Sequence, residues 1–119
     1  MSDKKMVKIG VDGSVEVVPY TGYESLRDGV GGWIECVNLS DTVSLWCDEE
    51  GKLKGLPPNT LATMLFAERF GFADIILGNC CVLGGVDDEG ESLGCPQETI
   101  DKIVGMARMQ EPRINVTFY

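Results

Sequence analysis

The sequence predicts one α+β domain over residues 1–119, with an antiparallel-rich sheet of five to six strands and two to three helices. Two observations lead to this prediction. Short segments of alternating apolar and polar residues, separated by tight turns, indicate paired antiparallel strands. A segment over residues 61–70 is apolar on almost every side, which is typical of a helix buried on most of its faces.

The first half of the chain is predicted to form two strand pairs joined by a short helix. An Asp-Gly turn lies inside residues 6–19, which therefore form a β-hairpin. A short helix over residues 23–28 follows the hairpin. Residues 33–39 are expected to form a central strand around which the fold is built, and residues 42–47 form the strand that pairs with it.

The second half is predicted to contain the main core helix and a further central strand. Asn59 or Thr60 caps the helix, which lies across the sheet. The apolar segment 74–85 is interrupted by Gly78-Asn79 and is expected to form a kinked or bulged strand. The remaining elements are an acidic loop over residues 86–94, a helix from residue 96 to about residue 109, and a closing strand over residues 114–119.

The charge and composition limit the possible partners. The net charge of −9 argues against direct binding to nucleic acid, which needs clustered lysine and arginine. No apolar segment is long enough to span a bilayer, and residues 1–6 lack the apolar core of a signal peptide. The five cysteines show no Cys-x-x-Cys spacing, which fits a reducing compartment. We therefore expect a cytoplasmic protein that does not contact membranes.

The residue types also limit the chemistry. The sequence contains no histidine, which excludes Ser-His-Asp and Cys-His catalytic sets and histidine-containing zinc sites. Cys80 and Cys81 are neighbours in a predicted strand, so their side chains point to opposite faces and cannot hold one ion together. We therefore expect no catalytic residue, no metal and no cofactor. A hydrolase that uses two carboxylates stays open, because no pair can be located in the sequence.

One set of residues is predicted to bind a small ligand. The helix start at Asn59 and Thr60 presents free backbone N–H groups, which suit a phosphate or carboxylate. Trp33 and Glu35 alternate on one strand face, where the ring could stack a base and the carboxylate could accept from its amino group. The ligand-binding candidates are Asn59, Thr60, Thr63, Trp33, Glu35 and Asn79. Each also has a structural interpretation as a cap, a core-facing hydroxyl, a core or rim residue, or a left-handed turn residue.

A second set of residues is predicted to bind a protein partner. Residues 71–101 contain seven acidic residues and no basic residue. This acidic face either keeps the protein soluble or docks on a basic partner such as a DNA-handling enzyme. The partner-binding candidates are Asp87, Asp88, Glu89 and Glu91.

Three motifs carry a family resemblance. They are VGGWIE at residues 30–35, GLPxNxxAT at residues 55–63 and GNCxV at residues 78–82. Together they resemble a domain of unknown function found in small proteins of bacteriophages and mobile elements, over most of residues 7–93. The resemblance falls on Asn59 and Thr63 but supplies no catalytic residue. It implies an accessory gene that acts in a bacterial cytoplasm, and such genes often blunt host defence.

These observations lead to a functional hypothesis. We expect a non-enzymatic accessory protein that counters host defence by sequestering a nucleotide-like signalling ligand. The alternative is an acidic inhibitor that docks on a host defence or DNA-handling protein, and a small hydrolase is a third possibility. The apolar residues Trp33, Trp46, Phe70 and Phe72 provide surface for self-association, so a homodimer is expected.

Overall fold

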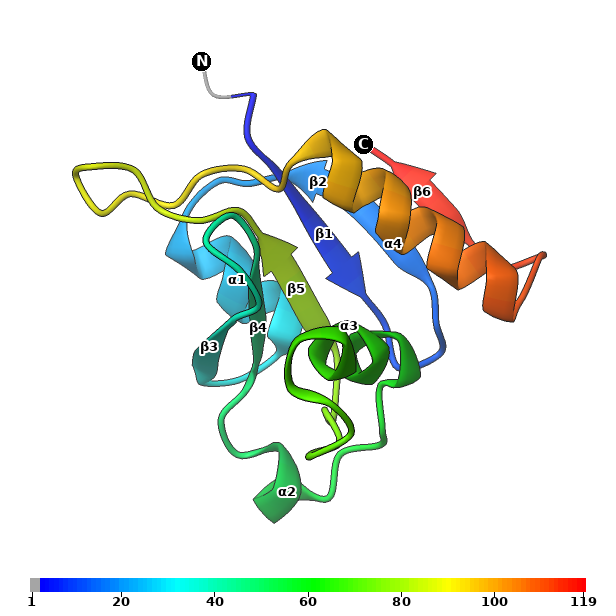
Figure 1. Ribbon diagram of the computed structural model, residues 1–119. Helices are drawn as coiled ribbons and strands as arrows, with labels where there is room; N and C mark the ends of the chain where they lie inside the picture. Colours follow the sequence, from blue (N-terminus) through cyan, green and yellow to red (C-terminus); the bar gives the residue numbers. More distant parts are fainter. Residues whose placement is uncertain (1–2) are drawn as a thin grey trace.

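The structure, a computed structural model, describes residues 3–119 and confirms the predicted α+β fold (Figure 1). The strands are β1 (Lys5–Ile9), β2 (Val15–Pro19), β3 (Ile34–Asn38), β4 (Ser44–Asp48), β5 (Cys80–Leu83) and β6 (Val116–Phe118). The helices are α1 (Tyr23–Val30), α2 (Gly51–Lys54), α3 (Thr60–Phe70) and α4 (Gln97–Gln110). Only the one-turn helix α2 lies outside the elements predicted from the sequence.

The six strands form one sheet in the order β3-β4-β5-β1-β2-β6, in which β2 and β6 are parallel and the other neighbours antiparallel. The prediction that residues 33–39 form the central strand is wrong, because β3 lies at an edge. Its Glu35, Cys36 and Asn38 are exposed, as suits an edge strand. All four residues of β5 are buried, and this strand lies in the middle of the sheet as predicted.

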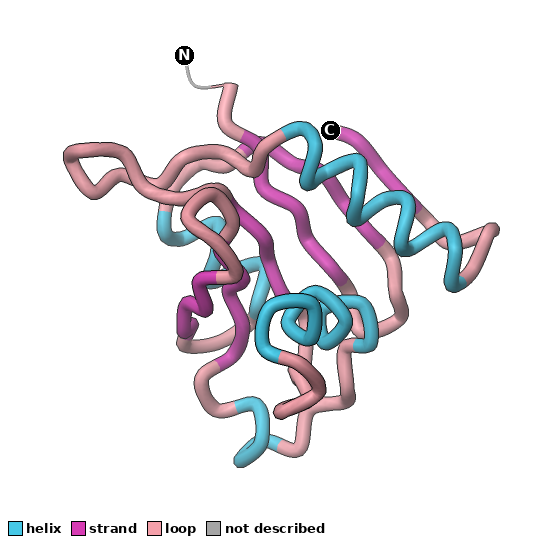
Figure 2. Tube along the Cα trace, viewed as in Figure 1, coloured by secondary structure: helices cyan, strands magenta, loops and turns pink. Residues whose placement is uncertain are grey.

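Helices cover both faces of the sheet (Figure 2). α3 and α4 pack on one face, where Leu61 and Ile103 join the larger hydrophobic core. α1 packs on the opposite face, where Leu26 joins a smaller core. Because side chains alternate along a strand, Cys80 belongs to the larger core and Cys81 to the smaller one. This confirms that the two adjacent thiols point to opposite faces.

The predicted strand over residues 74–85 is shorter in the structure. β5 begins only at Cys80, because Gly78 has a φ of +82° and turns the chain just before it. Before that turn, Leu77 forms a single bridge with Pro58. The interruption at Gly78-Asn79 therefore ends the strand, and the left-handed residue is the glycine rather than Asn79.

The five cysteines differ sharply in accessibility. Cys36 is exposed, whereas the other four are buried. Burial raises the pKa of Cys81 and Cys95 to about 12 each, and burial with the nearby Glu35 carboxylate raises that of Cys47 to about 12. Burial also raises the pKa of Cys80. Thiolates at these four positions are therefore negligible near neutral pH.

We expect a thiol-alkylating reagent at pH 7.5 to modify Cys36 in the folded protein and all five cysteines in denaturant. Intact-mass spectrometry over time counts the modified residues, and peptide mapping locates them. Rapid modification of a second cysteine in the folded protein would contradict the burial described here.

Candidate functional site

Asn59 lies where the start of α3 meets two loops at one end of the sheet. Its side chain is 0% exposed, and Oδ1 accepts a hydrogen bond of 3.1 Å from the backbone N–H of Ala62, which caps α3. Nδ2 donates to the carbonyl oxygens of Ile9 at 3.0 Å and Gly78 at 2.9 Å. The N-cap of α3 is therefore Asn59 and not Thr60. Both the oxygen and the nitrogen of the Asn59 side-chain amide are therefore hydrogen-bonded within the protein.

The two threonines near Asn59 have different environments. Thr60 is exposed on the first turn of α3. Thr63 is half-buried, and its Oγ1 accepts a hydrogen bond of 2.9 Å from the backbone N–H of Ile76. Thr63 therefore ties the segment before β5 to α3.

The segments that carry the GLPxNxxAT and GNCxV motifs are joined by backbone hydrogen bonds. The N–H of Asn59 donates to the carbonyl of Ile76, and the N–H of Gly78 donates to the carbonyl of Pro57, both at 2.8 Å. A cleft of about 200 Å³ lies where these segments meet, which is here named the motif junction, and residues of all three motifs line it. Its motif residues are Val30, Gly31, Leu56, Pro57, Gly78 and Asn79. The motifs are far apart in sequence, so only the folded chain brings them together.

Asn79 also lines a larger cleft of about 410 Å³ beside the β1–β2 turn. Its Oδ1 accepts a hydrogen bond of 3.1 Å from the backbone N–H of Val11, which shares both clefts. The charged residues of the larger cleft are Lys8, Asp12, Glu16 and Asp28. Three carboxylates thus face one ammonium group, and this balance disfavours a ligand with several phosphates.

An ion pair between a buried carboxylate and a partly exposed lysine lines the smaller cleft. Asp48 is 6% exposed, and its Oδ2 accepts a hydrogen bond of 2.7 Å from Nζ of Lys54. Burial raises the pKa of Asp48, but the hydrogen bonds from Lys54 and from the backbone N–H of Glu50, with the Lys54 charge, lower it below the ordinary value. A Cβ at Gly32 would lie 2.5 Å from Oδ2 of Asp48, so the second glycine of VGGWIE makes room for the pair. The sequence analysis did not identify this pair.

Trp33 and Glu35 do not form one binding face. Trp33 precedes β3, is 56% exposed, and lies beneath the guanidinium of Arg27 at 4.2 Å from the ring centroid. Glu35 lies within β3, where its carboxylate accepts a contact of 3.8 Å from the thiol of Cys47. Cys47 belongs to the core beneath α3 and α4, and Arg27 lies on α1 of the opposite face. The side chains of Trp33 and Glu35 therefore contact different parts of the protein.

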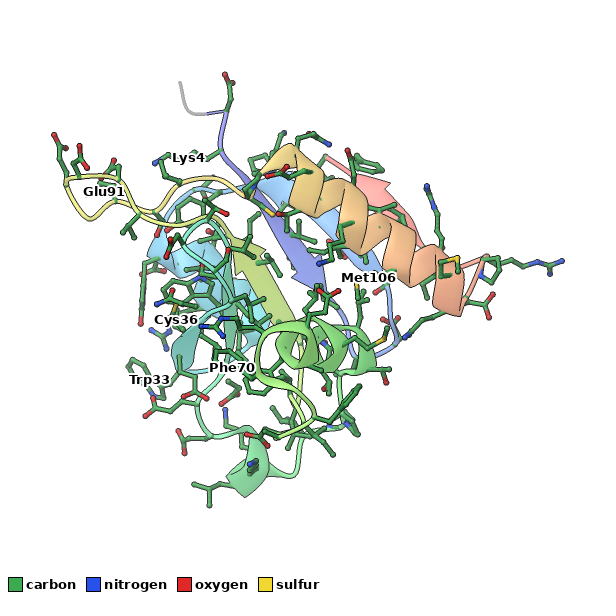
Figure 3. All side chains as sticks on the ribbon, viewed as in Figure 1. Lys4, Trp33, Cys36, Phe70, Glu91 and Met106 are labelled. Atoms are coloured by element: carbon green, nitrogen blue, oxygen red, sulfur yellow. The ribbon has the colours of Figure 1, made fainter. Side chains whose placement is uncertain are left out.

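The predicted acidic loop is a short hairpin after β5, and its residues 86–92 are here named the acidic hairpin. It projects from the body of the molecule, with Glu91 near its outer end (Figure 3). Val86 and Ser92 form a bridge at its base, and the N–H of Asp87 donates to the carbonyl of Glu91 at 2.9 Å. The hairpin therefore has a defined backbone conformation.

The four carboxylates of the acidic hairpin are exposed, but they are not equivalent. Oδ1 of Asp87 accepts hydrogen bonds from the backbone N–H groups of Glu89 at 2.8 Å and Glu91 at 3.0 Å. Asp87 thus holds the turn in shape. Asp88, Glu89 and Glu91 present their carboxylates to solvent, and reversing their charge leaves the side-chain bonds of the turn in place.

A cleft of about 470 Å³ separates the acidic hairpin from the β3–β4 turn and is here named the hairpin cleft. Its floor includes Trp46, whose Nε1–H donates to Oγ of Ser44 at 2.9 Å, and that hydroxyl donates to the carbonyl of Gly84 at 2.8 Å. A Cβ at Gly85 would collide with the backbone carbonyl oxygen of Asp41, so a glycine is required where the two segments touch. The sequence analysis did not identify this cleft.

Two features of residues 3–119 bear on the chemistry of the site. Across these described residues, no group of three or more cysteine and acidic side chains has an arrangement that could hold a metal ion. The helices of the same residues include none that is long and apolar enough to cross a membrane.

A model of one protein family, described as a domain of unknown function (DUF3846), matches residues 4–108. The match runs from before β1 into the last turn of α4 and therefore includes the motif junction, the hairpin cleft and the acidic hairpin. The chain matches no curated protein and no solved structure.

Proposed function

The chain belongs to the DUF3846 family, and we propose from the charge on its surface that it is a non-enzymatic docking protein. In this proposal it is an accessory protein of a phage or mobile element. The acidic hairpin docks on a basic surface of a host defence or DNA-handling protein and so counters defence. The phage setting rests on the resemblance of the three motifs.

The observation that carries this proposal is the acidic hairpin itself. It holds four exposed carboxylates on a backbone that its own hydrogen bonds define, and it extends beyond the rest of the fold (Figure 3). A projecting group of like charges on a defined backbone attracts an opposite charge and loses less backbone entropy on binding than a flexible loop would. In contrast, Asn59 and Thr63, two of the residues predicted to bind a ligand, make their hydrogen bonds inside the protein.

The experiment compares three proteins as baits in a bacterial lysate. The hairpin variant replaces Asp88, Glu89 and Glu91 with lysine and keeps Asp87, whose hydrogen bonds hold the turn. A control variant reverses the exposed Glu24, Glu49 and Glu111, which lie outside the hairpin and give the same change in net charge.

We expect one host protein to be enriched at least about tenfold by the wild-type chain and the control but not by the hairpin variant, and to dissociate near 0.5 M salt as screened charges do. The binding is then confirmed with the purified partner. A partner that the hairpin variant retains, or one that resists high salt, would show that the hairpin is not the docking element.

The second candidate function is sequestration of a nucleotide-like ligand. The cleft beside the β1–β2 turn favours it, because Asn79 and Lys8 line a space of about 410 Å³ next to the motif junction. A nucleoside with few phosphates suits its three carboxylates better than a highly charged nucleotide. In this case Asn79→Ala lowers ligand affinity at least about tenfold, as expected for losing a hydrogen bond that the bound ligand would cover. The same substitution leaves capture of a protein partner unchanged.

A further inference from the structure

We infer that the hairpin cleft receives an arginine side chain of the docked partner, with its guanidinium beside Trp46. This inference rests on the proposed docking function and names the chemistry of the partner at that surface. Its starting point is that the cleft lies between the acidic hairpin and the β3–β4 turn.

Polar side chains of β3, of the β3–β4 turn and of β4 line the cleft beside the indole ring of Trp46. Cys36 and Asn38 of β3 pair with Trp46 and Ser44 of β4, so the four side chains share the α1 face of the sheet. The wall opposite the acidic hairpin is the β3–β4 turn. Among the described residues no basic side chain lines the cleft, and the ammonium group of Lys4 reaches the Ser92 carbonyl at its rim.

The charge around the cleft favours a cation as its occupant. The Asp41 carboxylate lies in one wall, and the hairpin that forms the other wall carries Asp88, Glu89 and Glu91. Lys4 donates a hydrogen bond of 2.6 Å to the carbonyl of Ser92, which fixes the return strand of the hairpin. An anionic ligand would meet the Asp41 carboxylate in the cleft and the hairpin carboxylates on its approach, whereas a cation complements both.

The aromatic floor distinguishes arginine from lysine. Trp46 is half-buried, and its indole N–H is already bonded to Ser44, so the ring is held in one orientation within the cleft. A planar guanidinium can stack on an indole and donate to several acceptors in a fixed fork, whereas a lysine ammonium is a compact, strongly hydrated charge. The protein uses the same pairing elsewhere, where Arg27 lies over Trp33.

The test uses two defined probes, a labelled eight-residue peptide of alternating arginine and glycine and a peptide with lysine at the same positions. Fluorescence polarisation measures the affinity of both at low salt. For the wild-type chain we expect the arginine peptide to bind about fivefold more tightly than the lysine peptide. Trp46→Leu should reduce this ratio to about one.

Two further variants keep the test independent of folding. Asp41→Asn changes an exposed side chain and should weaken the arginine peptide more than the lysine peptide. Trp33→Leu removes the tryptophan outside the cleft and should leave the ratio unchanged. Circular dichroism and the unfolding midpoint establish that each variant is folded.

The outcomes separate this inference from the docking proposal. Equal binding of the two peptides to the wild-type chain, or a ratio that survives Trp46→Leu in a folded variant, would overturn the arginine inference alone. Binding that is unaffected by reversal of Asp88, Glu89 and Glu91 would instead overturn the docking proposal, because the hairpin charge would then play no part.

Discussion

Replacing Asn59 by alanine is expected to lower the free energy of unfolding by about 3 kcal/mol, a large fraction of the roughly 5–15 kcal/mol that holds a domain together. The substitution removes the cap of α3, which costs about 1 kcal/mol. It also leaves the buried carbonyls of Ile9 and Gly78 without the Asn59 donor, which costs a further 1–3 kcal/mol or so. Urea unfolding followed by far-UV circular dichroism measures the change.

The matched control is Thr60→Ala, one residue further along the same helix. Thr60 is exposed, so this variant should stay within about 0.5 kcal/mol of the wild type. An Asn59→Ala variant that loses less than about 1 kcal/mol would mean that the two carbonyls find other donors. The role of Asn59 as the link between α3 and the two loops would then be wrong.

The Lys54→Met substitution is expected to cost about 2 kcal/mol at pH 7, because it leaves Asp48 as a buried carboxylate without its cation. Removing one partner of a fully buried pair costs about 3–5 kcal/mol, and this value is reduced here because solvent screens Lys54, whose side chain is 39% exposed. Chemical unfolding at pH 7 measures the loss. Lys52→Met is the control, since its pair with Asp74 is exposed and should contribute about 0.5 kcal/mol or less.

The difference in unfolding free energy between the wild type and the Lys54→Met variant is expected to depend on pH in a defined direction. The pKa of Asp48 is lowered in the folded chain, so its contribution is fully present above the unfolded pKa of about 3.9 and is lost as the pH falls through the folded value. In the Lys54→Met variant, burial is opposed mainly by the Glu50 N–H, so the pKa of Asp48 rises. Because both proteins share the unfolded pKa, the stability gap should shrink as the pH falls from the raised pKa of the variant through the lowered pKa of the wild type, and a gap that is constant from pH 7 to pH 3 would contradict this account.

The elements that local sequence signals define were predicted well. The Asp-Gly turn, the asparagine before α3 and the apolar periodicity of α4 act within a few residues, so the pattern alone locates the β1–β2 hairpin and both helices. The order of the strands depends on contacts between distant segments. Residues 33–39 contain Trp33 and Val37 and therefore suggested a central strand, but β5 buries both of its faces and occupies that place.

The candidate site was predicted only in part, for a similar reason. The exposure of the acidic hairpin follows from its composition, and Asn79 does line a cleft. The hydrogen bonds of Asn59 could not be foreseen, because the two carbonyl groups that accept them, those of Ile9 and Gly78, are distant from it in sequence. The Asp48–Lys54 pair spans a turn and a short helix, and the hairpin cleft needs two segments that meet only in the folded chain.

Native mass spectrometry of the chain purified from a bacterial cytoplasm tests the central claim most directly. It reports the subunit number, for which we expect a homodimer, and it reports any retained molecule. The docking account predicts a protein partner that is retained by the wild-type chain and by the control reversed at Glu24, Glu49 and Glu111, and that is lost when Asp88, Glu89 and Glu91 are reversed. A stoichiometric small molecule that the hairpin variant keeps, with no protein partner, would contradict the account and favour sequestration of a ligand.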